Sequence, residues 1–189
     1  VKNIIKNAEG LSVPDDDIWT SGMDTEIITE EVPEKNIPNE TGVSDVDDKM
    51  PGVSLVEKGM NWMLSPRGFG PDADKKSTFN IMHAAGIMGN LLQESGRKGD
   101  ITPWIEHTTE KSIGIAQWNP AKGAGWRRQK MEAFAASLNL NSQTLYPQML
   151  YLKEELLNPH PDVGDVGWNE LLASNSIEEA TAVFMNKFE

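Results

Sequence analysis

The 189-residue chain contains no cysteine and only three histidines. The first absence excludes disulfides, a thiol nucleophile and cysteine-ligated zinc. The histidines, His83, His107 and His160, do not have the close same-face spacing of a helical zinc site, so we assign them structural or surface positions. Enzymes that cut amide bonds with a metal cluster or a Cys-His pair are therefore disfavoured, and we expect no metal and no cofactor.

The chain also lacks an excess of positive charge and a long apolar run. Its formal net charge is −12, which argues against nucleic-acid binding because phosphate contacts need Lys and Arg. The same charge argues against a polybasic membrane anchor. No apolar segment is long enough to span a bilayer, and the first residues do not continue into the core of a signal peptide. We expect neither a nucleic-acid partner nor a membrane anchor.

Acidic residues are concentrated near the N-terminus. Residues 1–50 hold 4 basic and 13 acidic residues, whereas the remainder holds 13 basic and 16 acidic residues. We predict that residues 1–51 form an extended acidic arm or linker. It is either a solvated spacer or an arm ordered against a partner, since apolar residues such as Ile4 and Trp19 exceed what a spacer needs. The chain ends at Glu189 inside a helical pattern, so we expect a fragment whose last domain is truncated.

From residue 52 onward the apolar residues recur at helical spacing, and Ser54 and Ser176 each begin a capping box. The predicted helices are Leu55–Leu64, Thr78 to about Ser95 with Ser77 as its cap, Trp126–Leu138, about Gln143–Leu157, Trp168–Ala173, and a last helix from Ser176 to the chain end. Residues 97–121 are predicted to form a loop, in which a small β-hairpin could occur. Gly86 and Gly89 weaken a helix, so a close neighbour is expected at each.

A glutamate stands in the last turn of the second predicted helix, followed by a helix-ending glycine: Glu94-Ser95-Gly96. Helices favour acidic residues at their N-terminus and cations at their C-terminus. A carboxyl group at the opposite end, near apolar groups, is expected to be harder to ionise. The protonated form is what a general acid requires, so Glu94 is the candidate proton donor for glycoside cleavage.

Residues around Glu94 supply the other requirements of a sugar cleft. Ser95 could hydrogen-bond the carboxyl group or a substrate amide, and Gln117 could both donate to and accept from an acetamido group. Trp104 and Trp118 have flat apolar faces suited to pyranose rings, although each could equally belong to the core. The sequence therefore predicts Ser95, Gln117, Trp118 and Trp104 as substrate-binding residues.

These motifs carry a resemblance to a known family. The segments Ala85–Leu91, Glu94–Gly96 and Gly114–Trp118, with Arg127 or Arg128 opening the next helix, resemble the phage tail lysozyme domains of the lysozyme-like superfamily. Gly-Ile-Ala-Gln at 114–117 is similar to an element of goose-type lysozymes and lytic transglycosylases. The resemblance implies a mainly α, lysozyme-like domain over residues 52–189, peptidoglycan as substrate, and Glu94 as the catalytic acid.

The second carboxylate is less well defined. Asp100, Glu106 and Glu110 all lie between the two motifs, and the spacing favours Asp100 as the catalytic partner of Glu94, although each could be a surface charge. In a lytic transglycosylase none would be needed, because one glutamate acts first as acid and then as base. The sequence leaves hydrolase and transglycosylase open.

We predict a tail-associated lysozyme that cleaves the β-1,4 bond between N-acetylmuramic acid and N-acetylglucosamine and so helps genome entry. The expected location is the virion tail or injection apparatus, with action in the host cell wall or periplasm. Other tail proteins are expected partners through the acidic arm. The alternatives are a lytic transglycosylase that uses the same Glu94, a structural tail component without turnover, and a peptidoglycan-binding module.

Overall fold

A computed structural model describes residues 50–71, 78–121, 126–161 and 163–188. These residues form the helices α2 (Leu55–Leu64), α3 (Ile81–Ser95), α4 (Arg127–Ser137), α5 (Leu145–Leu157), α6 (Trp168–Ala173) and α7 (Ile177–Lys187). The predicted mainly α fold is confirmed. Pairing of extended backbone in the described part is limited to three isolated bridges, Arg97–Asp100, Glu106–Ile113 and Ile113–Trp118, all within the segment 97–121 where a small hairpin was considered. No helix within the described ranges is long and apolar enough to cross a membrane.

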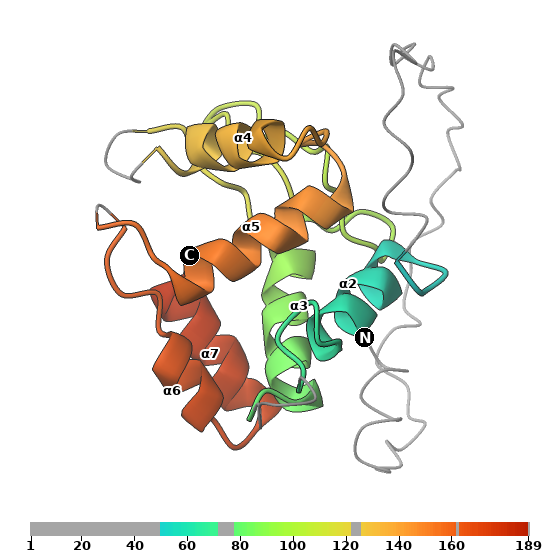
Figure 1. The fold of residues 1–189 in the computed structure, drawn as a ribbon, viewed down its shortest axis with the longest axis vertical. Helices are drawn as coiled ribbons and strands as arrows, with labels where there is room; N and C mark the ends of the chain where they lie inside the picture. The colour runs from blue at the N-terminus through green and yellow to red at the C-terminus, as the bar shows by residue number, and fades with distance from the viewer. Residues whose placement is uncertain (1–49, 72–77, 122–125, 162, 189) are drawn as a thin grey trace, which may run out of the picture. The chain divides into compact units, whose positions relative to one another are not determined.

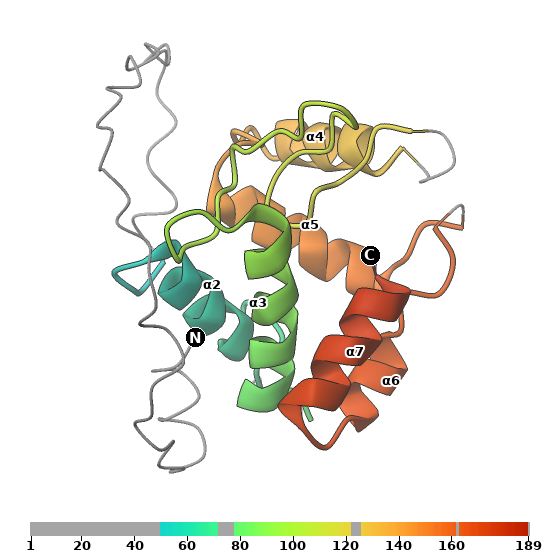
Figure 2. The same cartoon turned by 180° about the vertical axis from the view of Figure 1, so that it is seen from behind.

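Helix α3 is the centre of the fold. Figures 1 and 2 show it between α2 on one side and α6 with α7 on the other, while α5 crosses near its C-terminal end and α4 packs on α5. Its buried face includes Ile87, Met88 and Leu91, each at most 2% exposed. The C-terminal end of α3 therefore meets the loop that leads to α4, and this junction holds the candidate site.

The contact between α3 and α7 explains one of the two helix glycines. A Cβ atom on Gly86 would lie 2.7 Å from Ala180 Cβ and 2.8 Å from the backbone nitrogen of Thr181. Asn90 strengthens the same contact, because its amide donates to the carbonyl oxygens of Gly86 and Thr181. The close neighbour expected at Gly86 is thus confirmed. The same expectation for Gly89 is wrong, since a Cβ atom there would have nothing within 4 Å.

The start of α3 differs from the sequence prediction. The helix begins at Ile81, and its cap is Asn80, whose side chain accepts a hydrogen bond from the Met82 amide at 2.8 Å. His83 Nδ1 accepts a hydrogen bond from the backbone N–H of Asn80 at 3.1 Å, and Nε2 of the same ring contacts the Ser174 carbonyl oxygen at 3.3 Å. This cap is supported through His83 by the residue that follows α6, and it is preferred over Ser77, the cap predicted from the sequence. Ser77 lies outside the described residues. His83 has the structural role assigned to it from the sequence.

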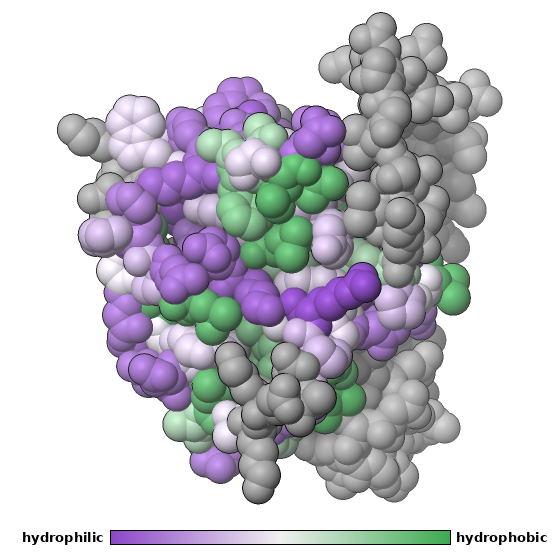
Figure 3. Space-filling view, in the orientation of Figure 1, coloured by the Kyte–Doolittle hydropathy of each residue, from purple (hydrophilic) through white to green (hydrophobic). Residues whose placement is uncertain are grey.

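The surface mixes polar and apolar areas, as the face in Figure 3 shows. Large apolar side chains that remain exposed come from several different elements rather than from one. They are Val53, Ile81, Trp104, Trp126, Leu138, Leu157 and Met185. Scattered exposure of this kind is ordinary on protein surfaces and by itself indicates no binding role.

Candidate active site

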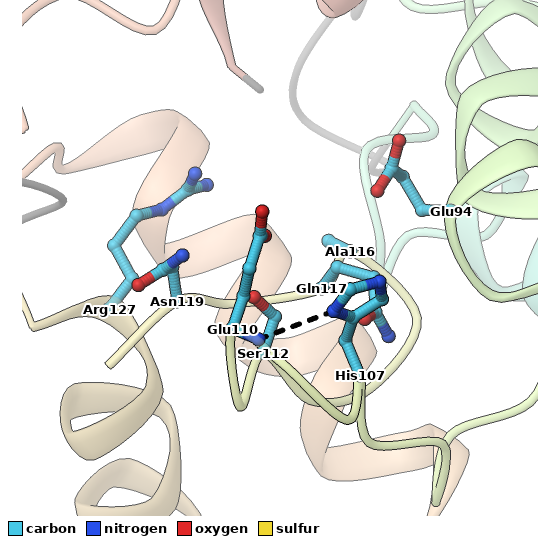
Figure 4. Close-up of a pocket in the computed structure, with 8 residues that line it drawn as sticks. All are labelled: Glu94, His107, Glu110, Ser112, Ala116, Gln117, Asn119 and Arg127. Atoms are coloured by element: carbon cyan, nitrogen blue, oxygen red, sulfur yellow. Dashed lines mark hydrogen bonds between the residues drawn. The ribbon is translucent and has the colours of Figure 1, made fainter. Parts of the chain in front are cut away.

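A pocket of about 420 Å³ opens between the C-terminal end of α3, the loop that follows it, and the start of α4. Figure 4 shows the side chains around it. The residues that line this pocket are Glu94, His107, Glu110, Ser112, Ala116, Gln117, Asn119 and Arg127. All but one of these side chains are polar, which suits a hydroxyl-rich and amide-rich ligand such as a sugar chain.

Glu94 lies in the last turn of α3 and is partly exposed. Its carboxylate points into the pocket (Figure 4) and makes no hydrogen bond or ion pair with any described residue. The carboxylate also sits at the negative end of the helix dipole. The apolar surroundings expected from the sequence are limited here to Ala116, because the remaining lining is polar. Glu94 is therefore accessible to a ligand and is not engaged by the protein.

The Gly-Ile-Ala-Gln turn is held against α5 by a buried amide. Gln148 is fully buried, and its side-chain oxygen accepts from the Ile115 amide at 2.9 Å. Its nitrogen donates to the carbonyl oxygens of Pro103 and Ser142. Gly114 has a φ of +84°, and a Cβ there would lie 2.6 Å from Gln148 Oε1. Only glycine combines this backbone conformation with this close approach.

Gln117 is the polar end of that turn. Its φ is +45°, which is uncommon for a residue with a side chain. The side-chain nitrogen donates to the Gly114 carbonyl oxygen at 2.9 Å, and the residue is only partly exposed. This bond fixes the amide at the pocket wall while its oxygen and second N–H stay available. The structure thus brings Gln117 and Glu94, which the sequence singled out, to one pocket.

Trp118, predicted to hold a sugar ring, belongs to the core. It is 0% exposed, its indole N–H donates to Glu155 Oε2 at 2.9 Å, and its ring packs edge-on against Tyr151. Trp104 is 58% exposed, but it is not part of the pocket lining. The geometry therefore places neither tryptophan face in the Glu94 pocket.

Ser95 lies next to Glu94 in sequence but faces the protein interior. It is 1% exposed. Its hydroxyl donates to the Leu91 carbonyl oxygen at 2.9 Å and accepts from the Thr102 amide at 3.3 Å. Ser95 thus joins the end of α3 to the following loop, and it does not line the Glu94 pocket.

Asp100, the sequence-based choice for the second carboxylate, lies outside the pocket lining. Its two oxygens accept hydrogen bonds from the backbone amides of Leu55 and Val56 at 2.9 and 2.7 Å. It therefore caps the N-terminus of α2, where an acidic group satisfies free amides and complements the helix dipole. The structure does not bring Asp100 together with Glu94, because its carboxylate is committed to this cap.

The other two acidic residues, Glu106 and Glu110, lie on one turn, but their carboxylates have different surroundings. Glu106 pairs with Arg128 at 2.9 Å and with Lys111 at 3.4 Å, outside the pocket lining. These hydrogen bonds lower the pKa of Glu106. Glu110 lines the pocket with Glu94, and Figure 4 shows both carboxyl groups directed into the same open space. Of the three acids considered, Glu110 is the one that lines the pocket with Glu94.

Arg128 clamps this turn to α4. One guanidinium nitrogen donates to both Glu106 Oε2 and the Lys111 carbonyl oxygen, at 2.9 and 2.7 Å. Another donates to Glu132 on the same helix at 2.9 Å. Within the turn, His107 Nδ1 accepts from the Glu110 amide at 3.3 Å, drawn as a dashed line in Figure 4. The clamp sets the position of the side chains that the turn contributes to the pocket.

Arg127 links the pocket to the core. Its guanidinium donates to both oxygens of Glu155, at 2.7 and 2.9 Å, and to the Phe188 carbonyl oxygen at 2.9 Å. The cation also lies 4.3 Å from the centre of the Phe188 ring. Arg127 is 8% and Glu155 is 3% exposed, so the pair is buried. Bidentate pairing of this kind fixes the arginine rigidly.

Gln148 and Glu155 support the pocket from α5, and neither was identified from the sequence. A signal for both was present, because each interrupts the apolar face of α5 formed by Leu145, Met149 and Leu152. A polar side chain on a buried helix face must find partners inside the protein. Three further residues of the pocket lining, His107, Ser112 and Asn119, were not predicted either. Their place in the lining depends on how the loop between α3 and α4 folds back toward Glu94.

Known proteins give an independent indication of the family. The model of the phage tail lysozyme family matches residues 73–189, a range that includes every residue lining the Glu94 pocket. The comparisons with curated proteins and with solved structures gave no significant match. Because the matched range spans more than half of the sequence and contains the pocket in full, the chain belongs to the phage tail lysozyme family.

Proposed function

We propose that the chain is a glycosidase of the phage tail that cleaves the β-1,4 bond between N-acetylmuramic acid and N-acetylglucosamine, with Glu94 as general acid. Membership in the family implies a peptidoglycan-degrading enzyme in general. The observation that carries the finer proposal is the unengaged Glu94 carboxylate, which shares a polar pocket with Glu110 and Gln117.

In this proposal Glu94 protonates the oxygen that leaves with the departing sugar, as an oxocarbenium-like centre forms at the anomeric carbon. Glu110 then acts from the opposite side. It either removes a proton from the attacking water or forms the covalent intermediate, and the separation of the two carboxyl groups in the substrate complex decides which. The turn suits this role because its backbone is held before the sugar binds, through the bond from the Glu110 amide to His107 Nδ1 and through Arg128.

Gln117 and Asn119 would orient the acetamido groups, since a primary amide matches both the donor and the acceptor of an acetamide. Gln117 keeps one N–H and its oxygen for this purpose while it bonds the Gly114 carbonyl oxygen. Ser112 and His107 line the same wall. The proposal leaves out Asp100, Ser95 and Trp118, because their polar groups are engaged elsewhere.

The first test uses purified peptidoglycan and mass spectrometry of the soluble fragments. Glu94→Gln is expected to reduce the rate by roughly 10²–10⁴-fold, the usual contribution of general acid catalysis. Glu170→Gln, an exposed glutamate on α6, is the matched control and should retain the parent rate. Unchanged release by Glu94→Gln would remove the basis of the proposal.

The products separate hydrolysis from transglycosylation. Fragments with a reducing muramic acid and a strong loss of rate in Glu110→Gln are expected for the hydrolase. Anhydro-muramic ends with a normal rate in Glu110→Gln would instead indicate a lytic transglycosylase that uses Glu94 alone. Binding to cell walls without any released fragment would indicate a structural or binding component.

We further propose that the protein is part of the virion tail and that residues 1–51 contact other tail proteins. The support is family membership together with the acidity of this segment, whose residues 1–49 lie outside the described part of the chain. Cross-linking in purified virions would test it. Cross-links from Lys2, Lys6 or Lys35 to another tail protein are expected, and their absence in an assembled tail that contains the chain would contradict it.

A further inference from the structure

A second pocket, of about 340 Å³, lies between α4, α5 and the loop that follows α5. We refer to it as the α4–α5 pocket. The residues that line it are Lys130, Phe134, Tyr151, Glu154, Glu155, Asn158, Pro159, His160 and Pro161. The lining combines aromatic rings, prolines and both signs of charge, which differs from the mainly polar lining around Glu94.

Tyr151 gives this pocket a specific polar group. The residue is 7% exposed, and its ring packs 5.5 Å from Trp118 and 5.6 Å from Phe134, centre to centre. Its hydroxyl makes no hydrogen bond with any described residue. Burial, and then the charge of Glu155, raise the pKa of Tyr151, so the phenol stays protonated. The hydroxyl is therefore able to donate a hydrogen bond to an acceptor on a ligand that enters the pocket.

The charges at the pocket define the rest of the ligand. Glu154 is exposed, and its carboxylate accepts from the Asn158 side-chain amide at 3.4 Å and forms no ion pair with a described residue. A ligand with an acceptor for Tyr151 and an ammonium for Glu154 would satisfy both groups. Lys130, on α4, lines the same pocket. A short peptide that contains a diamino acid has these groups.

A pyranose ring fits this pocket less well. Sugar rings pack on a flat and accessible aromatic face. Here the Phe134 and Tyr151 rings are inclined at 55° to each other, and Tyr151 is almost fully buried. They form a corner rather than a platform. Pro159 and Pro161 add apolar surface at the rim, which suits the methyl groups of alanine residues.

The α4–α5 pocket is connected to the Glu94 pocket through one ion pair. Glu155 lines the former, Arg127 lines the latter, and the two are joined by hydrogen bonds of 2.7 and 2.9 Å. Trp118 donates to the same carboxylate. A branched polymer that places its glycan at Glu94 would have a short branch available for the neighbouring pocket.

We propose that the α4–α5 pocket binds the peptide branch of peptidoglycan, with a peptide carbonyl oxygen on the Tyr151 hydroxyl and the side-chain ammonium of the diamino acid on Glu154. This inference rests on the proposed function for its substrate class. It assigns α4 and α5 a recognition role in addition to their support of the Glu94 pocket.

The test measures binding of a soluble tripeptide, L-Ala-D-isoGlu-L-Lys, to the full chain by calorimetry. The tripeptide is expected to bind, and Tyr151→Phe, which removes only the hydroxyl, should weaken binding by about 3–10-fold, the effect of one hydrogen bond. Glu154→Gln should weaken it similarly. Tyr146→Phe is the matched control, because it removes the hydroxyl of the other tyrosine, which does not line the pocket. Equal affinity in all four proteins, or no binding to the parent chain, would overturn the proposal.

A second readout separates this inference from the proposed function. Glu94→Gln should abolish release of fragments yet keep the tripeptide affinity. Tyr151→Phe should raise KM more on intact peptidoglycan than on glycan strands stripped of their peptides. If the parent chain released no fragments but bound the tripeptide with the stated dependence on Tyr151, the proposed function would fail and the peptide site would stand. Equal KM changes on both substrates would contradict the peptide site.

Discussion

Single side chains in this protein owe their roles to the partners that they meet. Glu94 and Glu110 have no ion-pair partner among the described residues, and they share a pocket. Asp100 and Glu106 lie a few residues away and are engaged by backbone amides and by cations, respectively. Acidic residues that are already engaged stabilise the fold, whereas unengaged ones are available for proton transfer. The proposed catalytic pair follows from this difference.

Glu106 gives a pH prediction at this scale. Its hydrogen bonds to Arg128 and Lys111 depress its pKa below the ordinary 4.5. A carboxylate whose folded pKa is depressed stabilises the fold above its unfolded pKa, and this stabilisation is lost as the pH falls through the folded value. Below about pH 4.5, the parent should therefore lose stability relative to Glu106→Gln. Denaturant titrations at about pH 7 and about pH 3.5 would measure the difference.

The expected size of this effect is small because Glu106 is exposed and its ion pairs are screened by solvent. If the parent and Glu106→Gln lost the same free energy of unfolding between the neutral and the acidic titration, the prediction would be contradicted. The fragment-release assay at the same two pH values adds a second measure, because loss of the Glu106–Arg128 contact should also loosen the turn that carries Glu110.

At the scale of elements, substitutions at two glycines with positive φ would distinguish backbone strain from a steric clash of the added Cβ. Gly114 (φ +84°) and Gly99 (φ +82°) have nearly the same φ, but only Gly114 has a neighbour where a Cβ would be. Gly114→Ala should destabilise the protein by roughly 2–4 kcal/mol, because strain adds to a clash with Gln148. Gly99→Ala should carry only the strain of about 1–2 kcal/mol. Chemical denaturation measures both.

Activity gives an independent measure for the same pair. Gly114→Ala should also slow fragment release, since Gln117 donates to the carbonyl oxygen of residue 114. Gly99→Ala should leave the rate near that of the parent at temperatures where both are folded. Equal destabilisation by the two substitutions would mean that Gln148 moves aside, and the buried amide would then not be what positions the turn.

The helix α3 offers a second matched pair. Gly86→Ala would force its Cβ to within 2.7 Å of Ala180 Cβ and 2.8 Å of a backbone nitrogen of α7. It should destabilise by roughly 1–3 kcal/mol. Gly89→Ala meets nothing within 4 Å and should stabilise by about 0.5–1 kcal/mol, the gain in helix propensity. Thermal unfolding of the two variants should thus shift in opposite directions, and a shared direction would contradict the packing of α3 on α7.

Across the whole molecule, the buried pair Arg127–Glu155 joins elements that are distant in sequence. It connects the start of α4, the loop at Trp118, the α5 helix and the residue after α7, Phe188. Both proposed sites lie beside it. The pair is thus placed to fix the positions of the two pockets relative to each other.

Removal of one partner should be strongly destabilising because it leaves a buried charge without compensation. Glu155→Gln is expected to cost about 3–5 kcal/mol. Glu154→Gln, the exposed neighbour, should change stability by less than about 0.5 kcal/mol. Replacement of both partners, Arg127→Met with Glu155→Met, should cost less than Glu155→Gln alone. Urea unfolding of these variants tests the ranking, and a Glu155→Gln value near that of Glu154→Gln would show that the pair contributes little.

The sequence by itself determined most of the helices and the position of the proposed proton donor, Glu94. Helix periodicity and caps are local signals, so Leu55–Leu64 and Trp168–Ala173 were predicted to the residue, and the helix that ends at Ser95 was right at its C-terminus. The motif around Glu94 and the Gly114–Trp118 segment also indicated the family that the comparison found. The start of α3 was misjudged because Asn80 is supported by a cap residue, His83, that contacts Ser174.

Only the tertiary structure decided which polar side chains line the Glu94 pocket. Asp100 caps a helix that begins 45 residues earlier, and Trp118 bonds a glutamate 37 residues later. Such contacts leave no periodic trace in the sequence, because they depend on where the loop between α3 and α4 folds back. They leave Asp100, Ser95 and Trp118 outside the lining of the Glu94 pocket and bring Glu110 to it. The chemistry of each residue was fixed by its type, but its availability was fixed by long-range packing.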